Sequence, residues 1–364
     1  MRIALVHDHL NQIGGAERVL KNLTEIFPKS PIYTLICDHH LIGDFFLPSR
    51  IHSSFIQKLP WSIKHLRWYL GMMPAAIERI DVRQYDVVIS DASAFAKGVL
   101  VRPGAVHICY CHTPTRYLWS DANSYTEELK HNAIIKKVVP FILTWLRMWD
   151  YVAAQRVDHF IANSHFVAQR IQKYYNRESQ VIYPPVDTHL YQPSFERDGY
   201  YIIIARLKAY KRVDIAIEAF NELKIPLVVV GSGEEEKNLK KIAKSHIKFT
   251  GQVSETEKRK LIAHSLALIQ PQEEDFGITA VEAMASGKPV IAYKAGGFLE
   301  TIIHGETGLF FEVQSWESLA HTILQFEPSQ FDPIKINAHT TQFSKERFAK
   351  EMTEFVQKTT HPIG

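Results

Sequence analysis

Hydrophobic residues along the chain form short unbroken runs, separated by segments in which apolar positions recur with helical spacing. The runs are rich in Val and Ile and do not alternate with polar residues, which is typical of parallel strands covered on both faces. Amphipathic segments such as Val213–Leu223 and Glu234–Lys244 lie between them. We predict strands near residues 2–6, 32–36, 87–89, 106–110, 159–162, 181–183, 201–205, 227–230, 247–249, 266–269, 290–293 and 308–311.

The strands and helices alternate in two blocks, which predicts an α/β protein with two doubly wound Rossmann-like domains. The blocks meet at Pro184 and Pro185, followed by a polar stretch that suits a hinge. We predict a first domain over 1–185, a second over 186–344 and a C-terminal helix in 345–364. The pattern of that helix suits either domain, and we expect it to pack on the first. Ligands of open α/β sheets bind beyond the carboxyl ends of the strands, so we expect an active site in a cleft between facing domains.

Composition narrows the functional class. A chain of 364 residues with 46% apolar and 22% charged residues is ordinary for a globular enzyme with two cores. The formal net charge of only +3 argues against nucleic acid as a partner. Three cysteines, a sparse and odd number, favour a reducing compartment. We find neither a secretory leader nor about eighteen consecutive apolar residues, and therefore expect a cytoplasmic protein.

The densest group of chemically useful residues lies in PQEEDFGITAVEAMASGKP, residues 271–289, after a predicted strand. Gly277 stands where a loop turns into a helix, and backbone N–H groups at such a helix start form an anion site. Glu274 and Glu282 suit hydrogen bonds to sugar and ribose hydroxyls, although they would also suit a capped surface helix with solvated acids. The candidates in this segment are Glu274, Phe276, Gly277, Ile278, Thr279 and Glu282.

Two more loops of the second domain follow predicted strands. Arg206 and Lys211 would together neutralise a diphosphate, although a solvated basic loop has the same composition. Gly231 and Gly233 would let the backbone approach a ligand closely, but they lack the full dinucleotide fingerprint.

Gly15 and His112 are the candidates of the first domain. Gly15 belongs to the glycine turn GGAE at a predicted helix start, which serves either a ligand or the loop itself. His112 follows a predicted strand in the sequence CYCHTPTR. It would donate to a sugar hydroxyl or orient the backbone, unless it is an ordinary loop histidine.

Neither a metal nor a cofactor is expected. His107, Cys109, Cys111 and His112 would suit zinc by residue type, but strand spacing divides them between two faces. The chain also has no Asp-x-Asp motif for a metal-bridged diphosphate. Neutralising phosphate charge would therefore depend on basic side chains.

Two segments, 55–80 and 136–149, combine basic and aromatic residues. The first reads FIQKLPWSIKHLRWYLGMMPAAIERI, and the second carries Trp145 and Trp149. Basic residues and Trp in helical segments suit the interface of an anionic bilayer, and equally suit core-packed helices with a basic edge. The first interpretation predicts a peripheral position on the inner face of the cell membrane.

Together these motifs resemble the retaining, two-domain GT-B glycosyltransferases called glycosyl transferases group 1. The resemblance extends from Gly14 to Gly308, and its most specific element is the Glu-x7-Glu motif formed by Glu274 and Glu282. The string HTPTRYLW is similar to a bacterial subgroup associated with mannosyl transfer in surface-polysaccharide assembly. A glycine commonly precedes the arginine of this family, where the present chain has Ala205.

The resemblance implies that the candidates line the site of a nucleotide-sugar donor. Glu274 would hold the donor sugar, Glu282 the ribose, and His112 would lie near the transferred sugar. The implied catalytic residues are His112, Glu274, Arg206 and Lys211. The implied donor-binding residues are Gly15, Arg206, Lys211, Gly231, Gly233, Glu274, Phe276, Gly277, Ile278, Thr279 and Glu282.

The resulting hypothesis is a metal-independent enzyme that transfers a hexose, in the first instance mannose from GDP-mannose, with retention. The acceptor would be a saccharide or a lipid-linked saccharide. No nucleophile is evident, which favours same-face attack guided by the leaving phosphate over a covalent intermediate. The alternatives are a UDP-hexose donor, a sugar-nucleotide epimerase, a dinucleotide oxidoreductase and a non-catalytic partner of a glycosyltransferase.

Overall fold

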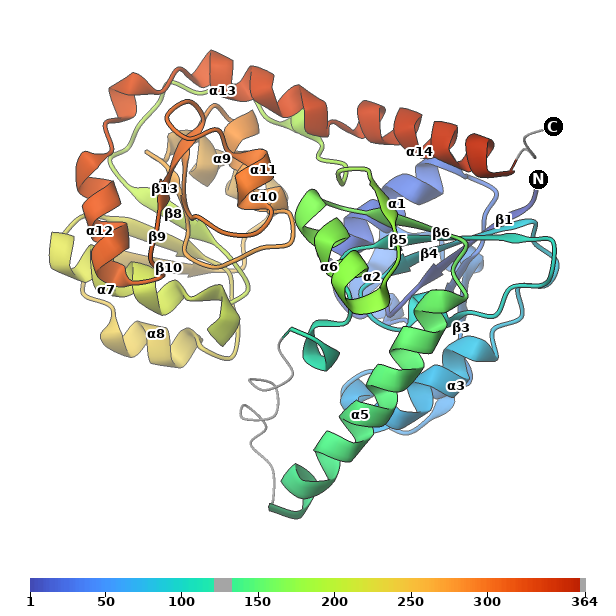
Figure 1. The fold of residues 1–364 in the computed structure, drawn as a ribbon. Coiled ribbons are helices and arrows are strands. Elements are labelled where there is room, and N and C mark those ends of the chain that lie inside the picture. The colour runs from blue at the N-terminus through green and yellow to red at the C-terminus, as the bar shows by residue number, and fades with distance from the viewer. Residues whose placement is uncertain (121–132, 361–364) are drawn as a thin grey trace. The chain divides into compact units, whose positions relative to one another are not determined.

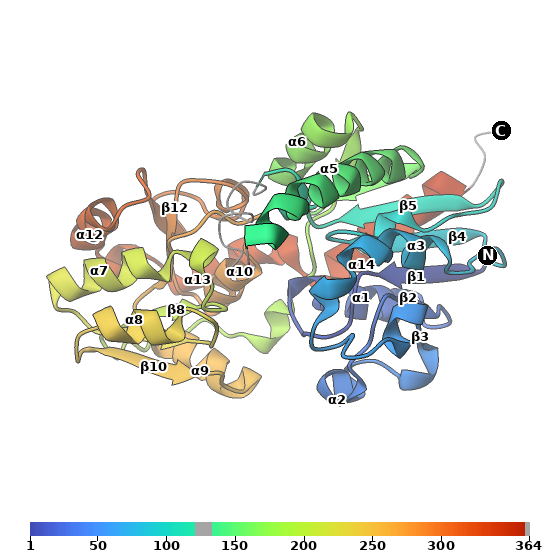
Figure 2. The same cartoon turned by 90° about the horizontal axis from the view of Figure 1, so that it is seen from below.

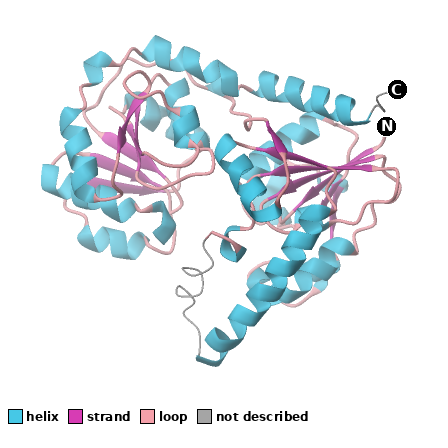
Figure 3. Ribbon diagram, in the orientation of Figure 1, coloured by secondary structure: helices cyan, strands magenta, loops and turns pink. Residues whose placement is uncertain are grey.

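The computed structural model describes residues 1–120 and 133–360, which form two compact units with all-parallel sheets covered by helices (Figures 1 and 3). The first unit comprises Met1–Pro185 and the chain from Phe348 onward, and the second comprises Val186–Arg347. Each is a doubly wound Rossmann-like domain, which confirms the predicted fold class.

The first unit has a seven-stranded sheet in the order β3-β2-β1-β4-β5-β6-β7. Its strands are β1 (Ile3–His7), β2 (Ile32–Thr34), β3 (Ile51–Ser53), β4 (Val87–Ala92), β5 (Val106–Cys111), β6 (His159–Ala162) and β7 (Ser179–Val181). Its helices are α1 (Gly15–Ile26), α2 (His39–Ile42), α3 (Met73–Glu78), α5 (Ala133–Gln155), α6 (His165–Tyr175) and most of α14 (Lys345–Thr360).

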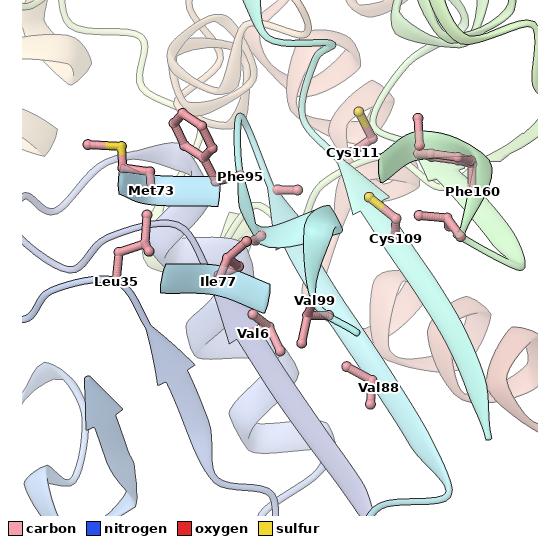
Figure 4. Close-up of a cluster of buried hydrophobic side chains, with 14 of the residues drawn as sticks. Val6, Leu35, Met73, Ile77, Val88, Phe95, Val99, Cys109, Cys111 and Phe160 are labelled. Carbon is pink, nitrogen blue, oxygen red and sulfur yellow. The ribbon is translucent and has the colours of Figure 1, made fainter. Parts of the chain in front are cut away.

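Alternate residues of the first sheet fill two separate cores. Ala4, Val6 and Val88 face a cluster that includes Ile77 of α3 and Leu146 of α5, part of which Figure 4 shows. The intervening residues of the same strands face the other cluster, beneath α1 and α14. Four residues of the C-terminal helix belong to this second core: Phe348, Met352, Phe355 and Val356. The helix therefore completes the hydrophobic interior of the first unit.

The second unit has a six-stranded sheet in the order β10-β9-β8-β11-β12-β13. Its strands are β8 (Tyr201–Ile204), β9 (Leu227–Val230), β10 (Ile247–Gly251), β11 (Leu268–Gln270), β12 (Val290–Tyr293) and β13 (Gly308–Phe311). Its helices are α7 (Val213–Leu223), α8 (Glu236–Ile242), α9 (Glu255–His264), α10 (Ile278–Ala285), α11 (Phe298–Thr301), α12 (Trp316–Gln325) and α13 (Pro333–His339). Helix α7 lies between α8 and α12 (Figure 2).

The structure differs from the sequence-based predictions in three places. The strand predicted at 181–183 is β7 at Ser179–Val181, and the three-residue edge strand β3 was not predicted at all. The segment 55–80 forms short 3-10 turns at Phe55–Lys58 and Leu66–Met72 followed by α3, instead of the amphipathic helix that its composition suggested. Pro60 and Pro74 explain this, because proline lacks the N–H that a continuous helix requires.

No described helix is both long enough and apolar enough to cross a bilayer.

Candidate active site

The polar loops of the second unit follow β8, β9, β11 and β12, and glycines let these loops pack on one another. A Cβ atom at Gly231 would lie 1.9 Å from the carbonyl oxygen of Ala205, and one at Gly233 would lie 2.3 Å from that of Leu207. Gly297, which the sequence did not single out, donates its N–H to the Glu274 carbonyl at 2.8 Å. Gly231 and Gly233 are thus needed to seat the loop after β9 against the loop that carries Arg206.

Lys211 and Glu274 meet within the second unit although they are 63 positions apart. The Lys211 ammonium donates to Glu274 Oε1, which also accepts from the Gln272 amide at 2.9 Å. The two charged side chains are only 14% and 20% exposed. Arg206 lies on the same loop as Lys211, is exposed, and has its guanidinium 3.5 Å from the Tyr210 hydroxyl. The loop therefore presents one half-buried and one exposed cation at the end of β8.

Helix α10 begins at Ile278, four residues after Glu274, and has an open first turn. Gly277 has φ +92°, a left-handed conformation that favours glycine. No side chain caps the helix, and its first turn carries no acidic residue. The N–H groups near Gly277, Ile278 and Thr279 therefore form a positive end to which an anion would bind. Phe276 is buried and packs edge-on against Phe343, which anchors this turn.

Glu282 is less accessible than the sequence suggested. Its side chain is 5% exposed and pairs with the Lys258 ammonium at 3.0 Å and 3.1 Å. Lys258 belongs to α9 and also pairs with Glu255 at 2.8 Å. A ribose hydroxyl would have to share the Glu282 carboxylate with Lys258.

In the first unit, His112 lies just beyond β5 and belongs to a buried row of ionisable groups. Its Nε2 is 2.6 Å from Asp91 Oδ1, and the other oxygen of Asp91 is 2.8 Å from Nδ1 of His7. His7 in turn has Nε2 3.6 Å from Glu17. Glu17 accepts the Gly14 N–H at 2.8 Å, directly before Gly15 at the start of α1. The structure thus connects two predicted site residues through Glu17, His7 and Asp91, for which no role was predicted.

Two further carboxylates order the loops around this row. Asp8 accepts four backbone N–H groups, of residues 93–96, at 2.7–2.8 Å. Asp150 of α5 is buried and pairs with Lys97 at 2.5 Å. It also accepts from Thr115, Trp119 and Tyr175, each at 2.8 Å. Thr115 and Trp119 belong to the string HTPTRYLW, which explains how that loop is held.

Cys109, Cys111, His107 and His112 do not gather into a metal site, since within the described residues no three His, Cys, Asp or Glu side chains do so. His107 instead bonds Ser90 at 2.9 Å, and burial lowers its pKa to about 4. Cys109 and Cys111 pack in the hydrophobic core beneath α5.

Stability should depend on pH through His7. Burial alone would lower the pKa of His7, but hydrogen bonds to Asp91 and Glu17, together with their charges, raise it to about 10. The folded pKa thus exceeds the unfolded value of about 6.5, so this contribution is complete below that pH and is lost as the pH rises to about 10. We expect the urea midpoint of the first unit to fall between pH 7 and 10, and His7→Gln to flatten that slope. Equal slopes in both proteins would contradict the assignment.

Two family models match adjoining parts of the chain. The model described as Glycosyltransferase Family 4 matches residues 13–190, and the model described as Glycosyl transferases group 1 matches residues 191–347. The chain belongs to this family of GT-B glycosyltransferases, which confirms the resemblance inferred from the motifs.

Similar proteins span nearly the whole chain. An alpha-1,3/1,6-mannosyltransferase, ALG2 of Yarrowia lipolytica, is 24% identical over 98% of this chain and 92% of its own length. HepE of Anabaena, solved in complex with UDP, has a TM-score of 0.72 at 18% identity, covering 98% of this chain and 100% of that one. Sucrose-phosphate synthase from Thermosynechococcus elongatus has a TM-score of 0.74 at 16% identity, covering 98% and 99%. At 18% and 16% identity, the similarity to these two solved structures is evidence for the fold alone.

Proposed function

We propose that this glycosyltransferase moves mannose from GDP-mannose to a lipid-linked saccharide, with retention of configuration and without a metal. The mannosyltransferase relatives support the sugar, since the Yarrowia protein and this chain align over almost their full lengths. The observation that carries the chemistry is the Lys211–Glu274 pair, placed just before the open first turn of α10. It brings a cation and a carboxylate suited to sugar hydroxyls close in sequence to a helix start suited to an anion.

In this proposal the cationic groups contact the diphosphate and the carboxylate contacts the sugar. Lys211, Arg206 and the start of α10 would neutralise the departing diphosphate, which is the largest charge that develops in the reaction. Glu274 would accept hydrogen bonds from hydroxyls of the donor sugar. The absence of an Asp-x-Asp motif and the presence of two cations support metal independence. Retention would proceed by same-face attack guided by the leaving phosphate, because the sequence shows no evident nucleophile for a covalent intermediate.

A uridine donor is the second candidate, because HepE was also solved in complex with UDP-glucose. A thermal-shift panel with GDP, GDP-mannose, UDP, UDP-glucose and UDP-N-acetylglucosamine separates the two. A nucleotide at about one hundred times its dissociation constant should stabilise the fold by roughly 2.7 kcal/mol. Stabilisation by guanine nucleotides alone supports GDP-mannose, and stabilisation by uridine nucleotides alone overturns it. The anomeric configuration of the product, read by NMR with a prenyl-diphosphate-linked oligosaccharide as acceptor, tests retention.

The first unit also offers a surface for a membrane that holds such an acceptor. One side of α5 exposes Phe141, Trp145, Met148 and Val152, spaced three or four residues apart, with 47–78% of each side chain exposed. Elsewhere in the unit Trp61 and Trp68 are 67% and 65% exposed, and His65 stacks on Trp68 at 4.4 Å. Lys64 and Arg67 flank these rings in the sequence, which suits an anionic lipid surface.

Charged substitutions on α5 should release the protein from such a surface. Burying a Phe or Met side chain is worth roughly 1.5–3 kcal/mol, so Phe141→Glu and Met148→Glu should each lower binding to anionic vesicles about tenfold or more. Leu324→Glu is the matched control, since Leu324 is 73% exposed on α12 of the other unit. Flotation with vesicles of phosphatidylglycerol and phosphatidylcholine measures this. Equal binding by all three variants and the wild type would count against α5 as the contact.

A further inference from the structure

Four ionisable side chains of the first unit form a row: the predicted site residue His112, and Asp91, His7 and Glu17, to which the proposed chemistry assigns no role. The last three are at most 3% exposed, and His112 is 13% exposed. Buried charges are costly unless they are paired and hydrogen-bonded, so a row of this kind is retained only where its members satisfy one another. The row reaches solvent at one end, through His112.

Hydrogen-bond donors and acceptors determine which ring nitrogens of this row carry protons. An ionised carboxylate only accepts hydrogen bonds, and the two oxygens of Asp91 face one nitrogen from each histidine. His112 must therefore carry a proton on Nε2, at 2.6 Å from Asp91. His7 donates from Nδ1 to Asp91, and its Nε2 lies 3.6 Å from Glu17. Burial lowers the pKa of His7, but the two carboxylates raise it to about 10, so both of its nitrogens carry protons. His7 is then a cation between two carboxylates.

The backbone register makes this arrangement rigid. His7 and Asp91 are register partners at the ends of the paired strands β1 and β4, and Ala92 pairs with Cys111, the residue before His112. At the other end, Glu17 accepts from the Gly14 N–H at 2.8 Å and from the Gln12 amide at 3.3 Å. The row thus connects the glycine turn that contains Gly15 with His112.

We propose that His7, Asp91 and Glu17 are positioning residues that hold the proton of His112 on Nε2 and keep the Gly14–Gly15 turn in register with it. The ring of His112 then meets its ligand through Nδ1, the nitrogen for which the described residues provide no partner. The ligand of Nδ1 is a hydroxyl of the sugar, and this clause rests on the proposed function. The position of the proton does not depend on which sugar is transferred.

A double-mutant cycle tests whether Asp91 acts through His112. Asp91→Asn keeps the shape but supplies only one accepting oxygen, and we expect kcat/KM to fall about 10–100-fold, the range seen for partners that orient metal-ligating histidines. His112→Ala should lose at least as much, and the double variant should be no slower than His112→Ala alone. Losses that multiply in the double variant would overturn the proposal.

His107→Gln is the matched control. His107 is a buried histidine of β5, the strand that precedes His112. It bonds Ser90 and lies outside the row. We expect it to lower the melting temperature while leaving kcat/KM within about twofold of the wild type. A kinetic loss as large as that of Asp91→Asn would mean that burial alone matters, and would overturn a positioning role.

A second measurement needs no substrate. Nitrogen-15 NMR of the full chain labelled at histidine, with the His112 signal identified by its loss in His112→Ala, reports which ring nitrogen carries the proton. We expect Nε2–H in the wild type and a mixture with Nδ1–H in Asp91→Asn. Nδ1–H in the wild type would overturn the inference even if mannosyl transfer is observed. Nε2–H in a protein that turns over no mannosyl donor would leave the inference standing while the proposed function fails.

Discussion

Replacing Lys211 with methionine is expected to lower kcat by about 10²–10³-fold, the usual cost of removing one group that stabilises charge in the transition state. Lys211 is the half-buried cation of the loop after β8, and its partner Glu274 is held in place by Gln272. Methionine keeps the length and the apolar stem of lysine but brings no charge to the departing diphosphate. The KM for the donor should change less than kcat, because the charge grows as the bond breaks.

Turnover of the nucleotide sugar, measured under saturating donor and acceptor, checks this result. Lys208→Met is the matched control, since Lys208 is a cation three residues earlier in the same loop, and no catalytic role is assigned to it. We expect its kcat to stay within about threefold of the wild type. A Lys211→Met enzyme with nearly full kcat would show that the diphosphate charge is neutralised elsewhere.

Replacing Asp150 with alanine is expected to lower the free energy of unfolding of the first unit by about 3–5 kcal/mol, the range for breaking a buried ion pair. Asp150 pairs with buried Lys97 and accepts three further hydrogen bonds. Burial lowers the pKa of Lys97. The charge of Asp150 and the hydrogen bond to it raise that pKa by more, so the net shift is upward. Alanine would leave that ammonium buried without its counter-charge.

Urea unfolding followed by tryptophan fluorescence suits this test, because Trp119 donates its indole N–H to Asp150. Asp150→Asn retains the shape and part of the hydrogen bonding, so we expect a smaller loss. Asp81→Ala removes an exposed carboxylate that pairs with Arg83 and should leave the midpoint unchanged. Loss of the same size in Asp81→Ala and Asp150→Ala would refute the importance of the buried pair.

Most strands could be predicted because buried parallel strands are continuous apolar runs. His159–Ala162, Leu227–Val230 and Gly308–Phe311 have the predicted bounds. Strand β3 was not predicted because it is a three-residue edge strand in which only Ile51 is apolar. An edge strand is paired on one side only, so the sequence carries little sign of it.

Part of the candidate site could be selected from the sequence. Residues such as Arg206 and Lys211 were selected because they follow a strand, where parallel sheets bind ligands. His7 ends β1 and Asp91 is the last residue but one of β4, but their pairing joins positions 84 residues apart and has no local pattern. Asp150 was not singled out, since helical spacing does not distinguish a solvated acid from one at 1% exposure. The feature of the sequence that could have indicated a buried carboxylate is its position among the apolar residues of the α5 segment.

The return of α14 to the first unit has a consequence for synthesis on the ribosome. The second unit is a continuous stretch, so its sequence is complete once Arg347 has left the exit tunnel. The first unit is translated earlier but still lacks Phe348, Met352, Phe355 and Val356, which complete the core of one face of its sheet. The unit translated first is therefore the last to close, and its uncovered apolar face has the longest exposure to chaperones in the nascent chain.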